Sequence, residues 1–428
     1  MNFFKQLGAV MMMGARAHAK WEIDTSNTIL RSRKRLLILA LLFIPIILGG
    51  IVFADDAAKV LPDIIGGKEA YNPAFYSTFI FIVSIFVGLG AGLITGCIGA
   101  GGGFIIAPAL MSAGVKGILA VGTDLFHIFA KAIMGSVIHK KLGNVNVPLA
   151  LVFLIGALLG TTAGGIINRV LYEINPVLSD AFITSVYSIM LGFLGFYSMF
   201  DFIKVWRKGG PVTSHGGKTE GVEMGSFPKT LQNINIPPMV TFDADITPGG
   251  HKISWVFLVI AGAFVGLAAG IMGVGGGFLT FPIFVYVLGV SSMTTVGTDI
   301  FQIIFTAGFG SITQYAVYGF IFYTLAMGML LGSLLGIQIG ALVTKVVSGI
   351  TIRGFYALSI MAGFVNRIFA LPSKLQSMDL IPLSKGLCET LSNIGAVLFF
   401  ITVGGFGIWV IGTFLMNLKT LKSGEAHS

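Results

Sequence analysis

Charge is scarce in this sequence. Only 11% of its 428 residues are charged, whereas 55% are hydrophobic. No soluble domain needs so apolar a composition. The apolar residues lie in continuous runs instead of alternating with polar ones, which excludes the strands of a membrane barrel. A helix of about 20 apolar residues crosses roughly 30 Å of hydrocarbon, and such runs recur along the chain. The predicted fold class is therefore an all-α polytopic membrane protein.

Cysteine and catalytic motifs are also sparse. Cys97 and Cys388 are too few for a disulfide framework, so we predict that both are buried packing thiols. The sequence shows no phosphate-binding loop, no metal-spaced His/Cys set and no Ser-His-Asp arrangement. We predict no enzyme, no cofactor and no metal site, and transport that runs on gradients. The net charge of +9 comes from Lys and Arg beside apolar runs, a pattern typical of cytoplasmic loops and not of nucleic-acid binding.

The chain contains two tandem copies of one unit. Residues 86–104 align without a gap on residues 260–278, and Gly-Thr-Asp at 122–124 corresponds to Gly-Thr-Asp at 297–299. Three glycines spaced by four, at 156, 160 and 164, match those at 332, 336 and 340. Glycines at this spacing form a flat strip that lets another helix backbone approach. Chance does not give so many matches in one order. The matches therefore predict two homologous repeats.

In each copy we predict a long glycine-rich span, a short apolar segment and three further spans. These lie at 77–98, 103–115, 117–138, 147–168 and 181–203 in the first copy, and at 254–274, 276–289, 293–314, 320–344 and 350–370 in the second. The chain is thus divided into a cytoplasmic N-terminal segment (1–35), a transmembrane anchor (36–53), repeat 1 (77–203), a polar cytoplasmic linker (204–253), repeat 2 (254–370) and a C-terminal helix (390–416). A cleaved signal peptide is the alternative to the anchor.

The short pieces decide the topology. If they cross the membrane, the second copy is inverted relative to the first; if they only dip in, the copies are parallel. Crossing places the basic clusters at 139–141 and 204–208, with Lys345 and Arg353, in the cytoplasm, and Arg169 and Arg367 outside. We therefore favour inverted repeats with both termini and the linker inside.

Crowded glycines at 99–103 and 273–277 predict breaks in the helices, because glycine without regular spacing unwinds a helix. A break inside the membrane is tolerated where it lines a cavity or is buried in protein. The short helix that follows would direct its amino end, with its free amides, toward an anion. The alternative is a tight turn at the membrane surface. The predicted site glycines are Gly101, Gly102, Gly103, Gly275, Gly276 and Gly277.

A polar stripe follows each break. Asp124, His127 and Lys131 share one helix face, and Asp299 and Gln302 occupy the corresponding places in the second copy. Thr-Asp at 123–124 and 298–299 can also be read as helix N-caps at the start of the third element. Lys131 is the cation predicted deepest inside a span; it either forms a salt bridge with Asp299 or Asp124 or attracts the substrate anion.

The motifs GCIGAGGGF and GIMGVGGGF, each followed by a proline and a Gly-Thr-Asp segment, resemble those of the TauE/SafE-type sulfite exporter family of membrane permeases. The resemblance covers residues 77–370, while the anchor, the long linker and the last span are additions. It implies transport of sulfite, sulfonates or related small organic anions; the residues by themselves imply only an anion.

We expect a secondary transporter in the cell inner membrane whose partners are a small anion and the lipid bilayer, with no nucleic acid. Proton coupling and oligomer formation are both open. An anion channel is the nearest alternative function, and a membrane receptor or enzyme that binds a ligand without translocating it is a further one.

Overall fold

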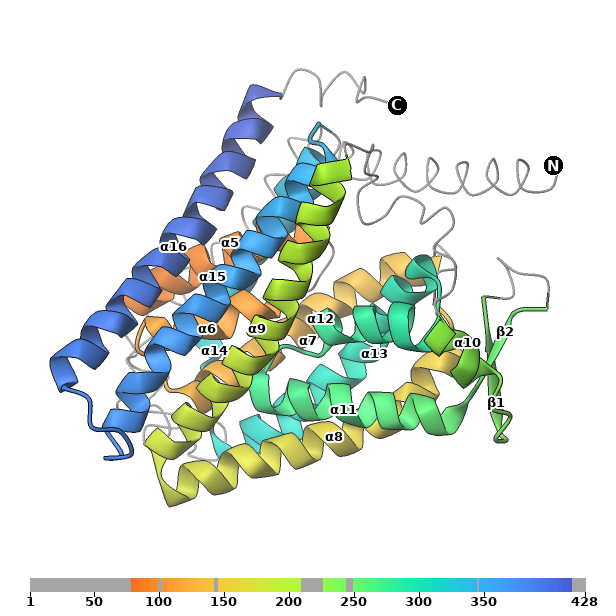
Figure 1. The fold of residues 1–428 in the computed structure, drawn as a ribbon, viewed down its shortest axis with the longest axis horizontal. Helices are drawn as coiled ribbons and strands as arrows, with labels where there is room; N and C mark the ends of the chain where they lie inside the picture. Colours follow the sequence, from red (N-terminus) through yellow and green to blue (C-terminus); the bar gives the residue numbers. More distant parts are fainter. Residues whose placement is uncertain are drawn as a thin grey trace.

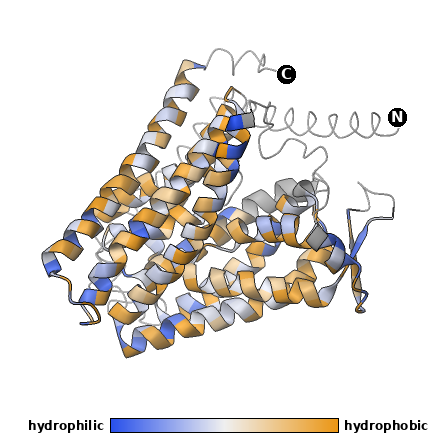
Figure 2. Ribbon diagram, in the orientation of Figure 1, coloured by the Kyte–Doolittle hydropathy of each residue, from blue (hydrophilic) through white to orange (hydrophobic). Residues whose placement is uncertain are grey.

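The computed structural model describes residues 78–98, 102–141, 145–208, 226–243, 249–344 and 346–417. The predicted N-terminal segment, the anchor at 36–53 and Gly101 lie outside these residues. In the described part, eight helices are long and apolar enough to cross a membrane, which confirms the all-helical, multi-span prediction. Figure 2 shows apolar residues along all the long helices and hydrophilic ones mainly near helix ends and on a small hairpin.

The helices follow the order that the repeats predict (Figure 1). The first copy comprises α5 (Thr78–Ile98), α6 (Gly103–Ser112), α7 (Gly117–Lys141), α8 (Val147–Ile174) and α9 (Pro176–Lys208). The second comprises α11 (Trp255–Met272), α12 (Gly277–Pro282) with the π-helical η2 (Ile283–Leu288), α13 (Ser292–Phe309) with the π-helical η3 (Gly310–Tyr315) and the 3₁₀ turn η4 (Ala316–Tyr318), α14 (Tyr323–Val343) and α15 (Gly349–Gln376). The last helix is α16 (Lys385–Met416).

Several helices extend beyond the predicted spans. Helix α9 runs from Pro176 to Lys208 where 181–203 is predicted, and α15 continues to Gln376 where 370 is the predicted end. The added turns are rich in polar residues, so an apolarity criterion ends too early. Pro176 suits a first helical position, because that amide has no partner within the helix.

The linker holds more regular structure than its composition predicts. Within it lie α10 (Ser226–Gln232) and an antiparallel hairpin of β1 (Met239–Phe242) and β2 (His251–Ser254). The Asp243 carboxylate accepts hydrogen bonds of 2.7 Å from both the amide and the hydroxyl of Ser291, the N-cap of α13. The hairpin is too short and too polar to give a periodic signal, and its bonds to a distant helix fix its position.

Glycine strips join the two copies, as their spacing predicts. Helix α5 packs on α14, and α8 packs on α11. A Cβ at Gly332 would lie 2.0 Å from the Ile85 carbonyl oxygen, and one at Gly160 would lie 2.1 Å from that of Ala263. Each copy's first helix thus packs against the other copy's fourth helix. Helices α7 and α13 also meet, as do α9 and α15, so the copies interlock as one body.

Candidate functional site

The glycine runs break the helices, as predicted. Gly102 (φ 66°) and Gly276 (φ 87°), which precede α6 and α12, adopt the left-handed conformation that favours glycine. Gly273 and Gly275 do the same, and residues 273–276 are all buried. The second break is therefore enclosed by protein, as a break that lines or borders an internal site requires.

The backbone that the second break exposes is satisfied by side chains. Asn168 Nδ2 donates to the carbonyl oxygens of Gly270 (3.3 Å) and Ile271 (3.0 Å), at the end of α11. The Tyr315 hydroxyl donates to Gly270 O, and the Tyr187 hydroxyl donates to Met272 O. These donors replace the water that helix ends normally bind, which makes a break inside the bilayer tolerable.

The two breaks meet in the interior. A Cβ at Gly103 would lie 3.0 Å from Val274 Cα, and one at Gly275 would lie 2.8 Å from Ile128 Cγ2. Gly103 opens α6 of the first copy, Val274 lies in the second copy's break, and Ile128 belongs to α7. Residues far apart in the sequence are therefore juxtaposed where the copies face each other.

The prediction that Thr-Asp caps the third element is wrong. Thr123 and Thr298 lie well inside α7 and α13, not at their starts. Each hydroxyl instead accepts a hydrogen bond from a backbone amide of the other copy: Thr123 from Phe322 N at 2.9 Å, and Thr298 from Asn146 N at 3.0 Å. Both amides immediately precede a fourth helix. The motif caps a helix that is near in space but remote in sequence, which no local signal reveals.

The first polar stripe is enclosed. Asp124 and His127 have no exposed surface, and Asp124 Oδ1 lies 3.5 Å from His127 Nδ1. The other ring nitrogen, Nε2, lies 2.9 Å from the Ser333 hydroxyl of α14. Lys131 is half-buried, and its charge interacts with that of Asp124. This favours Asp124 over Asp299 as the electrostatic partner of Lys131.

The second stripe forms a hydrogen-bonded row. Gln302 Nε2 donates to Asp299 Oδ1 at 2.9 Å, and Thr306 donates to Gln302 Oε1 at 2.7 Å. The Asp299 carboxylate lies beside the first turn of α12, since a Cβ at Gly277 would be 3.1 Å from Asp299 Oδ2. The carboxylate itself thus occupies the position next to the amino end of α12 where an anion is predicted.

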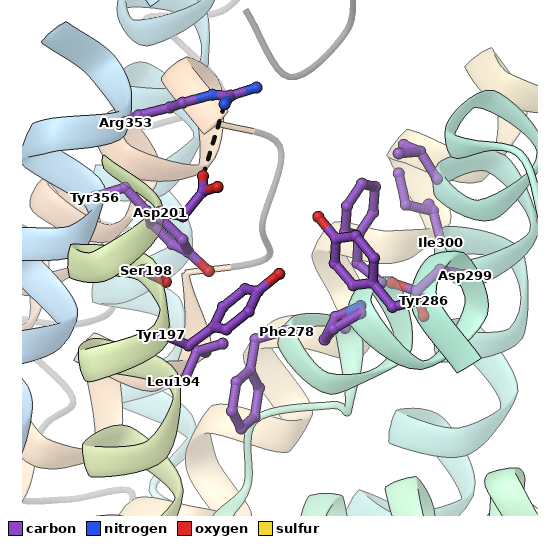
Figure 3. A pocket seen from close by; sticks show the side chains of 14 residues that line it. Leu194, Tyr197, Ser198, Asp201, Phe278, Tyr286, Asp299, Ile300, Arg353 and Tyr356 are labelled. Carbon is purple, nitrogen blue, oxygen red and sulfur yellow. Dashed lines mark ion pairs between the residues drawn. The ribbon is translucent and has the colours of Figure 1, made fainter. Parts of the chain in front are cut away.

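A pocket adjoins the second stripe (Figure 3). The space between its walls is about 940 Å³, open solvent included, and it lies between α9 and α15 on one side and α12–η2 and α13 on the other. Its lining residues are Leu194, Tyr197, Ser198, Asp201, Gly277, Phe278, Phe281, Pro282, Tyr286, Val296, Asp299, Ile300, Arg353 and Tyr356. Of the predicted site residues, Gly277 and Asp299 line it; Gly102, Gly103, Asp124, His127, Lys131, Gly275, Gly276 and Gln302 lie elsewhere.

Arg353 is the cation of this pocket. Its Nη1 lies 3.7 Å from Asp201 Oδ2, and the two side chains are 25% and 48% exposed. Its Nε is buried and has no hydrogen-bond partner among the described residues. Across the pocket, the rings of Tyr197 and Tyr286 approach within 6.2 Å, centroid to centroid (Figure 3).

Sequence reasoning missed this part of the site. It treated Arg353 only as a cytoplasmic loop charge, although the residue lies inside the predicted span 350–370. The available signal was an arginine and an aspartate, Asp201, each near the end of a different predicted span. Such a pair is expensive in a membrane unless the charges meet or bind a ligand.

A second arginine is buried. Arg367, which the predicted topology places on the outer side, is 2% exposed within α15, so it is more enclosed by protein than Lys131. It donates to the Ser112 hydroxyl (2.7 Å), the Pro108 carbonyl oxygen (3.2 Å) and Asn366 Oδ1 (2.7 Å). Its burial depends on the packing of α6 against α15, which no local pattern shows. Its contacts fix α6 against α15.

Span-length helices in two interlocked copies, with a pocket among the spans, define a multi-pass helical membrane protein. The chain belongs to the TauE/SafE sulfite exporter family, because the profile described as "Sulfite exporter TauE/SafE" matches residues 84–367. This confirms the resemblance.

Named relatives agree with this membership. The chain is 23% identical to the probable membrane transporter protein YjnA of Bacillus subtilis (strain 168) over 60% of its length and 87% of the relative's. It is 24% identical to YunE of the same organism, also a probable membrane transporter protein, over 62% and 89%. Identity rises to 38% with sulfite exporter TauE/SafE family protein 6 of Arabidopsis thaliana, but over 17% of each chain. No solved structure matches the chain.

Proposed function

We propose that this protein is a secondary transporter of the cell inner membrane that carries sulfite, a sulfonate or a related organosulfur anion by alternating access. The observation that carries the proposal is the pocket between α9, α15, α12–η2 and α13, with Arg353 in its wall. Family membership and the name of the Arabidopsis relative support the substrate class.

The chemistry of the pocket suits an oxyanion. Arginine offers a planar set of donors that matches tetrahedral and planar oxyanions, and the Arg353 Nε donor has no partner in the described structure. At 3.7 Å the ion pair with the half-exposed Asp201 is loose, so an entering anion can displace that carboxylate. The hydroxyls of Tyr197, Tyr286 and Tyr356 supply further donors along the wall.

The surroundings of the two short helices differ, which supports alternating access. Ala107 of α6 is fully buried, whereas its counterpart in α12, Phe281, is half-buried and lines the pocket. Exchange of the two arrangements would close the Arg353 pocket and open the region of Gly102 and Gly103 to the opposite side, together with the first stripe. Under the predicted topology the present pocket opens toward the cytoplasm, because Lys204 and the other basic residues at the end of α9 lie nearby in sequence.

Flux into proteoliposomes tests the function. We expect labelled sulfite or methanesulfonate to enter faster than acetate, and Arg353→Met to weaken anion affinity at least ~10-fold, because charge-assisted hydrogen bonds contribute about 1.5–3 kcal/mol. Arg207→Met, which removes an exposed cation from the same end of α9, is the matched control. Normal flux in Arg353→Met would show that the pocket is not the substrate site.

The same vesicles separate the alternatives. A transporter accelerates labelled influx when unlabelled anion is present on the far side, whereas a channel carries current without that acceleration. Binding without any flux would favour the receptor or enzyme alternative.

We separately propose that the second copy is inverted in the membrane relative to the first, and cysteine labelling tests this arrangement. If the copies are inverted, Lys229→Cys in α10 should be unreactive to an impermeant reagent added outside, while Gly386→Cys in α16 should react. An added side chain at Gly386 meets nothing within 4 Å, so that variant should fold. Parallel copies would place both positions outside, and labelling of Lys229→Cys from the periplasm would overturn the inverted arrangement.

A further inference from the structure

We propose that Asp124 and His127 together bind one proton that this protein carries along with its anion. The proposal rests on the transport function above and names the coupling ion. It assigns the first polar stripe to the proton and the pocket around Arg353 to the anion. The observations that carry it are the hydrogen-bond geometry of His127, the enclosure of Asp124 and the contrast with the second copy.

The geometry of His127 suits a bound proton. Ser333 Oγ lies 3.3 Å from Leu330 O and 2.9 Å from His127 Nε2, so its hydrogen can go to either atom. When it goes to Leu330 O, the serine oxygen accepts from Nε2–H, and Nδ1 of the neutral ring carries a lone pair. That lone pair faces Asp124 Oδ1 at 3.5 Å, and the two atoms repel unless a proton lies between them. In the proposed site His127 adopts this tautomer.

The surroundings do not neutralise Asp124 by hydrogen bonds. Both of its carboxylate oxygens are buried without a hydrogen-bond partner among the described residues. Besides His127, the titratable or charged groups near it are Lys131 on the same helix and Tyr187 of α9, which itself interacts with Arg367 of α15. Tyr187 donates its hydrogen to Met272 O and is not available to the carboxylate. A bound proton supplies the missing donor.

The second copy shows what the same position does without a proton. There Gln302 replaces His127, and its amide donates a permanent hydrogen to Asp299 Oδ1 at 2.9 Å. A glutamine donates to the ionised carboxylate at any pH, whereas a histidine whose ring hydrogen is on Nε2 donates from Nδ1 only after taking up a proton. The chain therefore provides one stripe that binds a proton and one that does not.

The proton balance is simple. A proton from the water on one side binds between Asp124 and His127, crosses with the anion when the two copies exchange conformations, and leaves as the first stripe opens to the other side. No covalent bond other than that to the proton forms or breaks. One proton moved with one monovalent anion makes the cycle electrically neutral.

Infrared spectroscopy tests the site without reference to transport. The purified protein in lipid, titrated from acid to alkaline pH, should show the carbonyl stretch of a neutral carboxylic acid or the bands of an imidazolium ring, and these should disappear in both Asp124→Asn and His127→Gln. Asp201→Asn, which changes an exposed carboxylate, should keep them. The proposal would be overturned if the wild type and Asp124→Asn gave the same carboxylic-acid and imidazolium signals throughout the titration.

Proton movement tests the coupling. Methanesulfonate is fully ionised near neutral pH, so a pH dye inside proteoliposomes reports only protons that the protein carries. We expect one proton per anion in the wild type and a ratio near zero in His127→Gln, which copies the Asp299–Gln302 pair. An unaltered ratio in His127→Gln would refute proton binding by this pair while the transport function stands. If the wild type moves neither methanesulfonate nor sulfite, the proposed function fails, and the infrared result still decides whether the proton site exists.

Discussion

The two copies are alike where glycines pack helices together and different where the helices break. The packing of α5 on α14 repeats that of α11 on α8, and the Thr123 contact repeats that of Thr298. Around the breaks the symmetry is reduced: Ser112 of α6 is half-buried, whereas Tyr286, at the corresponding place in the second copy, is 48% exposed beside a pocket. A duplicated scaffold therefore gives its two short helices different surroundings.

One substitution and one difference in helix type distinguish the surroundings of the two short helices. Arg367 binds Pro108 and Ser112 and so ties α6 to α15. By the repeat alignment its counterpart in the first copy is Phe196, which offers α12 no hydrogen bond. Helix α12 then continues into the π-helical η2, whose wider hydrogen-bond pattern is common at functional sites. These differences favour α12–η2 as the element that moves.

The largest effect is expected where the copies are alike. Gly332→Leu would force a side chain into the α5 backbone, where even a Cβ meets a carbonyl oxygen at 2.0 Å, and Gly160→Leu would do the same between α8 and α11. Overpacking of this kind costs about 3 kcal/mol or more, so both variants should lose most folded protein in detergent. Gly405→Leu on α16, with nothing within 4 Å, is the control. A stable Gly332→Leu would mean that the close approach is not needed.

The second prediction concerns the hydrogen bonds that hold α6 against α15. Arg367→Met removes donors from the Pro108 carbonyl and from Ser112, and an unsatisfied buried group costs about 1–3 kcal/mol. We expect a lower unfolding temperature and increased reactivity of a cysteine placed at Ala107, which is fully buried. The matched Arg353→Met should affect anion affinity more than stability, because its side chain is 25% exposed and paired loosely. Equal loss of stability in both would remove the distinction between a structural and a binding arginine.

The sequence predicted what repeats locally and missed what depends on contacts across the copies. Regular glycines and apolar runs specified the helices and the packing strips, because both follow from periodicity along one helix. The partners of those strips, the depth of Arg367 and the role of Thr123 depend on which helices meet, and a single sequence does not contain that information. The pocket was missed because Arg353 and Asp201 become a pair only when α9 packs on α15.

The third prediction compares the first residues of the two short helices. Gly103→Ala would place a Cβ 3.0 Å from Val274 Cα, whereas Gly277→Ala would place it 3.1 Å from Asp299 Oδ2 and Ile303 Cδ1. Backbone cannot yield as side chains do, so Gly103→Ala should cost stability, about 1–2 kcal/mol. Gly277→Ala should cost less and should instead alter anion affinity, because it displaces the Asp299 carboxylate at the pocket wall. Thermal unfolding with and without sulfite separates the two effects. Identical profiles would argue that the breaks have equivalent surroundings.

The smallest effect is expected at the reciprocal threonine caps. Thr123→Val and Thr298→Val each keep the side-chain shape and remove one acceptor from a backbone amide of the other copy. The two losses should differ, because Phe322 is fully buried while Asn146 is half-buried, where water can replace the lost acceptor. A buried amide without an acceptor costs about 1–3 kcal/mol, and a solvated one about 1 kcal/mol or less. Thermal unfolding of the two variants, with Thr390→Val on the exposed face of α16 as control, measures the difference. An equal or reversed order would show that less water reaches the Asn146 amide than its half-buried position indicates, and the contrast between the copies would then be confined to the pocket itself.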